Sequence, residues 1–210
     1  MNLLRLFTGL SALVIATPAL AHHPMGGETP GTFMDGLLSG VGHPIIGLDH
    51  LAFIVAVGIA AALTPHRFVL PLAFIVATVA GTLIHLAAIS LPFPEAVIAL
   101  SVAAIGFVIL SGRDVGPVVL GGLFAVAGLF HGFAYGEAVF GAETTPVLAY
   151  LAGFAVTQYL IAIAAGHVVV EMIGKGLKGA QNTPARLSGA MVAGAGCLIV
   201  GEQAIAAMFG

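Results

Sequence analysis

The chain alternates long apolar runs with short polar breaks. The breaks read "TPHR", "LPFP", "GRDVG", "EAVFGAETT" and "IGKGLKGAQNTPAR". An apolar run of about 20 residues is long enough to cross a bilayer as a helix. A helix satisfies its own backbone hydrogen bonds in lipid, whereas an open strand edge does not. The pattern predicts an all-α membrane protein with six transmembrane helices, at approximately 33–63, 67–90, 95–112, 116–137, 146–172 and 187–208.

The first residues are typical of a secretory signal peptide. Arg5 precedes the apolar stretch "LFTGLSALVIA", and "ALA" at 19–21 matches an A-x-A cleavage site. The alternative is an uncleaved first helix, but the helix-breaking Pro18 beside the A-x-A motif favours cleavage. We therefore expect a signal peptide at 1–21 and one mature six-helix transmembrane domain at 22–210.

The first apolar run contains a predicted break. Residues 33–63 would measure about 46 Å as one helix, which is longer than a single crossing requires. A proline inside the run removes a backbone donor and disfavours helix at His43, the residue before it. We expect the break near Gly42–Pro44, where it would turn His43 towards Asp49 and His50.

Composition supports a membrane protein and excludes other classes. Hydrophobic residues make up 60% of the chain and charged residues 7%, with a mean hydropathy of +1.13. Soluble domains carry about 25% charged residues. The net charge of −3 gives no reason to expect nucleic acid as a partner. No GxxxxGK[ST] motif or GxSxG-type serine is present. We therefore expect a lipid-embedded protein that is not an enzyme.

The basic residues predict the orientation. With the mature N-terminus outside, six crossings place every basic residue of the mature chain on a cytoplasmic connection, as the positive-inside rule requires. These residues are Arg67, Arg113, Lys175, Lys178 and Arg186. We expect a bacterial inner-membrane protein whose mature N- and C-termini are both periplasmic.

Side chains that bind metals are concentrated towards the outer side of this topology. An ionisable group at mid-membrane costs about 2.5–3.5 kcal/mol on insertion, so it indicates function. Imidazoles with a carboxylate or two suit divalent ions such as Ni²⁺, Co²⁺, Zn²⁺ and Cu²⁺. Some of the candidates have other interpretations: His85 could be a structural histidine, Glu137 a solvated helix end, and the pair His22 and His23 an accident of the cleavage site. The candidate metal ligands are His43, Asp49, His50, His131, His85, Glu137, His22 and His23.

One motif resembles a known family. "HPIIGLDH" at 43–50 is similar to the HPxxGxDH motif of HupE/UreJ proteins, nickel and cobalt permeases associated with hydrogenase and urease gene clusters. The resemblance extends over essentially the whole chain, including "FHGFAYGE" and "YLAGFAVTQYL". The chain departs from the family in its fifth span, where Ala162 stands about where a histidine is common and His167 lies further on.

The resemblance implies a permease that carries nickel or cobalt into the cell. It assigns His43, Asp49 and His50 to transport, with His131 and Glu137 as second candidates. Ni²⁺ or Co²⁺ is then the transported substrate, and we expect no permanently bound cofactor. Two alternatives remain at this stage: a membrane factor that delivers metal to a metalloenzyme, and a haem-binding electron-transfer protein. The sequence does not decide between nickel and cobalt, between facilitated and proton-linked transport, or between a monomer and a homo-oligomer.

Overall fold

The computed structural model describes residues 28–174 and 183–209, and these residues form helices and no strand. The predicted signal peptide, with His22 and His23, lies outside the described residues. The all-α fold class is confirmed. The helices in chain order are α2 (Phe33–Ile46), α3 (Leu48–Ala62), α4 (Leu70–Leu86), α5 (Pro94–Ser111), α6 (Pro117–Tyr135), the 3₁₀ turn η1 (Gly136–Val139), α7 (Thr144–Gly174) and α8 (Thr183–Phe209).

Each predicted apolar segment corresponds to one helix or helix pair. Prolines begin α5 and α6, and Thr32 caps α2 by accepting a hydrogen bond from the Asp35 amide at 3.2 Å. Among the described residues, four helices, α5 to α8, are long and apolar enough to cross a membrane. The pair α2 and α3 makes a fifth candidate if it counts as one span, and α4 is a shorter apolar helix of 17 residues.

The first segment is broken, but not where the sequence predicted. The break lies at Gly47, where α2 and α3 meet at 78°, and not near Gly42–Pro44. Pro44 sits inside α2, where the helix continues past it. Gly47 adopts an extended conformation (φ −72°, ψ 104°) that ends one helix and begins the next. The proline removes one hydrogen bond without ending the helix, whereas the change of backbone conformation at Gly47 redirects the chain.

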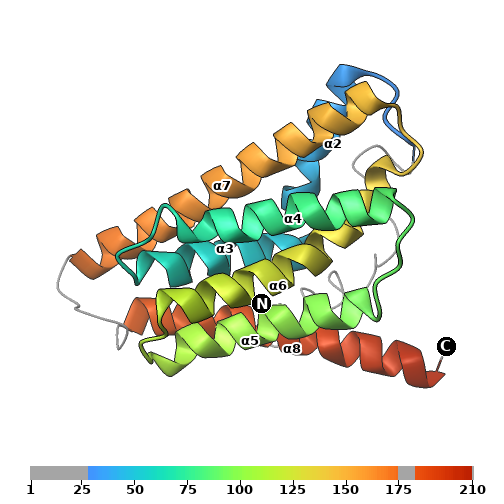
Figure 1. The fold of residues 1–210 in the computed structure, drawn as a ribbon. Helices are drawn as coiled ribbons and strands as arrows, with labels where there is room; N and C mark the ends of the chain where they lie inside the picture. The colour runs from blue at the N-terminus through green and yellow to red at the C-terminus, as the bar shows by residue number, and fades with distance from the viewer. Residues whose placement is uncertain (1–27, 175–182, 210) are drawn as a thin grey trace, which may run out of the picture.

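The helices pack in pairs through small residues. In Figure 1, α7 lies along α2 and α3, α4 lies beside α6, and α5 lies beside α8. At each crossing a glycine meets the backbone of the partner helix, because no side chain separates the two. Examples are Gly40 of α2 against Tyr150 of α7, Gly132 of α6 against Thr78 of α4, and Gly106 of α5 against Ala193 of α8.

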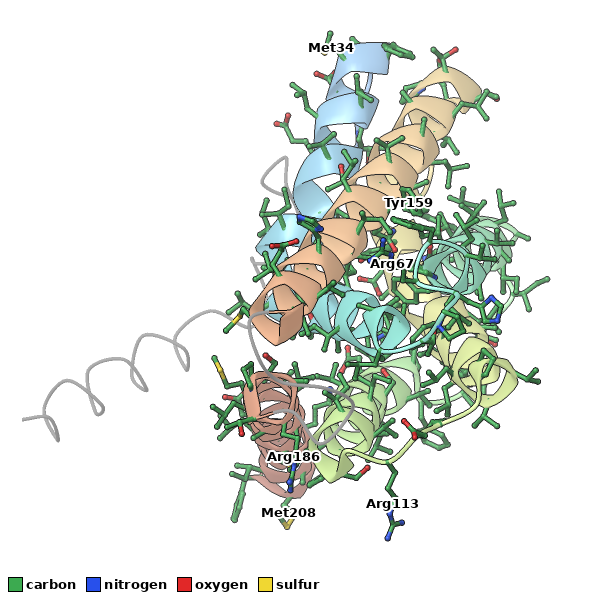
Figure 2. All side chains as sticks on the ribbon, turned by 90° about the vertical axis from the view of Figure 1, so that its left-hand side faces the viewer. Met34, Arg67, Arg113, Tyr159, Arg186 and Met208 are labelled. Carbon is green, nitrogen blue, oxygen red and sulfur yellow. The ribbon has the colours of Figure 1, made fainter. Side chains whose placement is uncertain are left out.

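The outer surface of the helix bundle is apolar. Large hydrophobic side chains project from it (Figure 2), among them Met34 and Met208, which are 54% and 69% exposed. Water would make such a surface costly, so it matches a lipid environment. Inside the bundle, a buried apolar cluster that includes Phe53, Phe74 and Phe124 joins α3, α4 and α6 to the other helices.

Basic residues gather at one end of the bundle. Arg67 follows α3, Arg113 follows α5 and Arg186 lies in the first turn of α8, and all three of these chain segments lie at the left of Figure 1. The start of α2 and the α4–α5 and α6–α7 connections lie at the opposite end. The Arg186 side chain donates to the Leu110 carbonyl at 2.9 Å, which ties α8 to the end of α5.

Candidate metal site

Three of the predicted histidines meet inside the bundle. His43 on α2, His50 on α3 and His131 on α6 are 2%, 1% and 0% exposed. The ring centroids lie 5.7 Å apart for His43 and His50, and 5.0 Å apart for His50 and His131. Imidazoles this deeply buried need polar partners, because an unpaired buried nitrogen is costly.

The bend at Gly47 brings His43 and His50 together. Seven residues of straight helix would separate them by about 10 Å along the axis. Because the chain turns between them, their rings instead approach edge to face. A Cβ atom at position 47 would lie 2.6 Å from Cδ2 of His50, so glycine also leaves room for that ring.

The α4–α6 contact positions His131. The next residue, Gly132, packs against the backbone of Thr78, and its carbonyl accepts a hydrogen bond from Thr82 Oγ1 at 2.8 Å. Phe53 and Phe74 border the His131 ring at centroid distances of 4.6 and 5.8 Å. His131 therefore lies where the polar cluster meets the apolar cluster.

His50 and His131 belong to one chain of hydrogen bonds. The two Nδ1 atoms lie 2.8 Å apart, and His131 Nε2 lies 3.0 Å from Ser101 Oγ on α5. The Ser101 hydroxyl donates to the Ile98 carbonyl at 2.7 Å. Both nitrogens of His131 are thus engaged by protein groups.

His43 belongs to a second series of hydrogen bonds. Its Nδ1 lies 2.8 Å from Tyr150 Oη on α7, and that hydroxyl donates to the Tyr135 carbonyl at 2.9 Å. The Tyr135 ring packs against His43 and His50 at centroid distances of 4.7 and 4.5 Å. The Tyr135 hydroxyl is buried and has no hydrogen-bond partner among the described residues.

Asp49 lies at the edge of this cluster, half-buried in the first turn of α3. Its Oδ1 accepts a hydrogen bond from the His50 amide at 2.8 Å. On a helix Asp49 points about 100° away from His50. Within residues 28–174 and 183–209, no three or more His, Cys, Asp or Glu side chains are grouped to hold a metal ion. The assignment of His43, Asp49 and His50 as one set of metal ligands therefore stays a prediction.

Two other predicted ligands have different surroundings. His85 on α4 packs against Phe133 and Phe140 at 4.6 and 5.6 Å, and its buried Nδ1 has no hydrogen-bond partner among the described residues. Glu137 lies in η1 and is exposed. No ring contact or hydrogen bond in the described structure joins His85 to the three-histidine cluster.

Sequence reasoning missed Tyr135, Tyr150 and Ser101. A signal was available for the tyrosines, since the chain has only three and two of them contact His43. Ser101 carried no such signal, because a serine in a membrane helix commonly bonds a carbonyl of its own helix.

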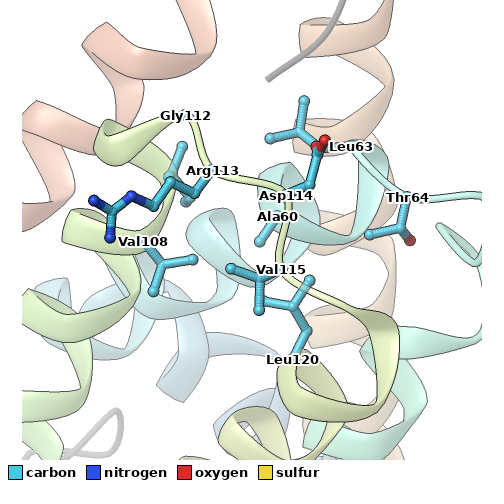
Figure 3. A pocket seen from close by; sticks show the side chains of 10 residues that line it. Ala60, Leu63, Thr64, Val108, Gly112, Arg113, Asp114, Val115 and Leu120 are labelled. Atoms are coloured by element: carbon cyan, nitrogen blue, oxygen red, sulfur yellow. The ribbon is translucent and has the colours of Figure 1, made fainter. Parts of the chain in front are cut away.

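The cavity drawn in Figure 3 is separate from the histidines. It has a volume of about 40 Å³ and lies at the other end of α3, beside Ala60 and Leu63. Its remaining walls come from Thr64, from α5 and α6, and from the segment between those two helices. The Arg113 side chain extends away from Leu63 (Figure 3). Its lining contains no histidine, so it is not the candidate metal site.

Comparison with known proteins identifies the family. The profile of the family described as "HupE / UreJ protein" matches residues 10–199. The chain belongs to the HupE/UreJ family. Protein HupE of Rhizobium leguminosarum bv. viciae is 31% identical over 205 residues, which cover 94% of this chain and 98% of that relative. No solved structure was found to match the chain.

The family assignment and the geometry concern the same segment. The HupE/UreJ-like motif at 43–50 spans the end of α2, the Gly47 break and the start of α3. The glycine of that motif makes the bend, and its two outer histidines are the pair that the bend brings together.

Proposed function

We propose that this protein carries a divalent transition-metal ion, nickel or cobalt, inward across the bacterial inner membrane. The observation that supports this most is the meeting of His43, His50 and His131, three buried imidazoles from three helices, at a broken helix. Imidazole nitrogen is a preferred donor for Ni²⁺ and Co²⁺. Broken helices at mid-membrane substrate sites recur in transporters.

The proposed topology has six crossings. The bent pair α2 and α3 counts as one crossing, and α4, at about 26 Å for 17 residues, is close to the thickness of the bilayer core. The end of the bundle that carries Arg67, Arg113 and Arg186 is then cytoplasmic by the positive-inside rule. The start of α2 and the end of α8 are periplasmic.

The helix ends at the break favour a cation. The last carbonyls of α2 give that end a partial negative charge, and His43 lies in its last turn. Asp49 in the first turn of α3 offsets the positive end of that helix. An arriving ion would exchange water for imidazole nitrogen, and the half-buried Asp49 would supply a carboxylate oxygen.

Transport requires release as well as binding. His43 and His50, with the Asp49 carboxylate as a third donor, would form a weaker site than a closed four-ligand sphere, and a weaker site suits an ion in transit. The buried cluster of Phe53, Phe74 and Phe124 would have to open for the ion to pass. In the proposed path this cluster follows His131, whose ring Phe53 and Phe74 contact.

Metal uptake by cells tests this function. Cells expressing the protein should accumulate radioactive nickel or cobalt faster than cells without it, at submicromolar concentrations. His50→Ala should reduce this uptake about 10- to 100-fold, as loss of a metal-site interaction does. The matched control is His66→Ala, since His66 is exposed in the turn after α3.

Three outcomes would contradict the proposal. Equal uptake by the wild type and His50→Ala would remove the site from the transport path. Delivery of metal to an enzyme without uptake would favour an assembly factor, and a Soret band in the purified protein would indicate haem.

A further inference from the structure

The hydrogen bonds around the histidines determine which ring nitrogens carry protons, and this extends the proposed function, on which it rests. A carbonyl oxygen cannot donate, so the 2.7 Å contact between Ser101 Oγ and the Ile98 carbonyl uses the serine's proton. His131 must then supply the proton for its 3.0 Å contact with Ser101, from Nε2. A neutral His131 keeps its lone pair on Nδ1.

The same reasoning assigns the ring proton of His50. Because Nδ1 of His131 carries the lone pair, the 2.8 Å contact between the two Nδ1 atoms uses a proton on His50. A neutral His50 therefore has its proton on Nδ1 and its lone pair on Nε2. The order of donation is His50 to His131, His131 to Ser101, and Ser101 to the Ile98 carbonyl.

His43 reaches the same tautomer by a separate route. The Tyr150 hydroxyl has one proton, and the 2.9 Å contact with the Tyr135 carbonyl uses it. His43 Nδ1 therefore donates to Tyr150 Oη across their 2.8 Å contact. A neutral His43 then has its lone pair on Nε2, as His50 does.

We infer that Tyr150 and Ser101 are positioning residues that hold His43 and His50 in the tautomer that can bind a metal through Nε2. Each chain of hydrogen bonds ends on a backbone carbonyl of a membrane helix, so the proton order is anchored to rigid structure. Metal-binding histidines generally donate their second nitrogen in this way, which fixes the ring and its tautomer. His131 has both nitrogens engaged and acts as the link between Ser101 and His50.

Nitrogen NMR tests the tautomers without any metal. Purified full-length protein labelled with ¹⁵N in its histidine rings, in detergent, should show Nδ1-protonated His43 and His50 and Nε2-protonated His131. Single His→Gln variants assign the signals. An Nε2-protonated His50 or His43 in the wild type would overturn the inference.

Two substitutions, each of which removes one hydroxyl, test the two series of hydrogen bonds separately. Tyr150→Phe should change the His43 tautomer and leave His50 unaltered. Ser101→Ala should change His131 and, through it, His50, and leave His43 unaltered. Ser101→Thr keeps a hydroxyl and should restore the wild-type pattern. Unchanged ring signals in both deletion variants would overturn the inference.

The controls remove hydroxyls of the same kind elsewhere. Ser111 is also on α5 and donates to a carbonyl of its own helix at 2.8 Å, and Tyr159 is also on α7 and donates to the Phe68 carbonyl at 3.3 Å. Neither contacts a histidine in the described structure. Ser111→Ala and Tyr159→Phe should leave all three histidine tautomers as in the wild type.

Metal titration gives a second readout. Binding of Co²⁺ to the purified protein, followed by its visible absorption, should weaken about 10- to 100-fold in Tyr150→Phe and Ser101→Ala and recover in Ser101→Thr. Unchanged Co²⁺ affinity in both deletion variants would overturn the positioning role. The metal-free tautomers and cellular uptake are independent measurements, so failure of transport and failure of this inference are distinguishable.

Discussion

At the scale of single residues, two tyrosines beside His43 differ in what their hydroxyls do. The Tyr150 hydroxyl links His43 to the Tyr135 carbonyl, whereas the Tyr135 hydroxyl is buried without a hydrogen-bond partner among the described residues. Both side chains are fully buried. Replacing each tyrosine with phenylalanine should therefore affect stability differently at the two positions.

We predict that Tyr150→Phe destabilises the protein by about 1–3 kcal/mol, because it leaves a ring nitrogen and a carbonyl without their partner. Tyr135→Phe should be neutral or stabilise the fold by about 1 kcal/mol, because it removes a buried hydroxyl that bonds nothing in the described structure. Thermal unfolding of the purified variants in detergent measures both. Equal destabilisation by the two substitutions would contradict this assignment of the hydroxyls.

At the scale of elements, the break between α2 and α3 builds the site, and close packing between helices holds it. Gly47 combines the bend with space for the His50 ring. Gly132 lets α6 approach α4 at the level of His131. These two roles predict what happens when each glycine is replaced by alanine, which adds one methyl group.

Gly47→Ala should leave the backbone conformation accessible, since its φ of −72° suits any residue. The added Cβ would lie 2.6 Å from His50 Cδ2 and displace that ring. We predict a fall in nickel uptake of about 10-fold or more, comparable to disturbing a ligand's support. Gly201→Ala, where a Cβ meets nothing within 4 Å, is the control. Normal uptake by Gly47→Ala would show that the ring tolerates displacement.

Gly132→Ala should separate α4 from α6, because the new Cβ would collide with the backbone of Thr78. We predict a loss of about 1–3 kcal/mol in stability, the usual cost of overpacking. Gly122→Ala on the same helix meets nothing within 4 Å and should be neutral or stabilise α6 by up to about 1 kcal/mol. Thermal unfolding of the two variants compares them directly, and equal midpoints would argue against the tight α4–α6 contact.

At the scale of the whole molecule, the arrangement of the bundle bears on its orientation. The connections with Arg67 and Arg113 lie at one end, and the α6–α7 connection, which carries the exposed Glu143, lies at the other. An apolar surface covers the bundle between these ends.

This geometry gives a topology prediction. In a protein with Cys197→Ser, a membrane-impermeant maleimide should label Glu143→Cys from the periplasmic side of intact cells. Arg113→Cys should react only after the membrane is opened, because Arg113 lies on the proposed cytoplasmic end. If Arg113→Cys is labelled in intact cells and Glu143→Cys is not, the protein has the opposite orientation in the membrane. If both are labelled from outside, the six-crossing arrangement is wrong.

Much of the fold followed from the sequence. The all-helical class and the apolar segments were predicted from hydropathy, and the family was recognised from "HPIIGLDH" and "FHGFAYGE" and confirmed by comparison. The break predicted in the first segment exists, but it lies at Gly47 and not near Gly42–Pro44, because the proline removes one hydrogen bond whereas the extended backbone at Gly47 ends the helix. His43, His50 and His131 were named as candidates, but Tyr150 and Ser101 were not.

The amino-acid sequence alone is enough to establish the apolar helices and the presence of side chains of the types that bind metals. Both are local properties, because hydropathy is a sum over neighbouring residues and donor chemistry belongs to each side chain. Which of these side chains meet depends on long-range packing, since His50 and His131 are 81 positions apart and His43 and Tyr150 are 107 apart. Such contacts depend on how closely glycine lets the helices approach and on the direction in which Gly47 turns the chain.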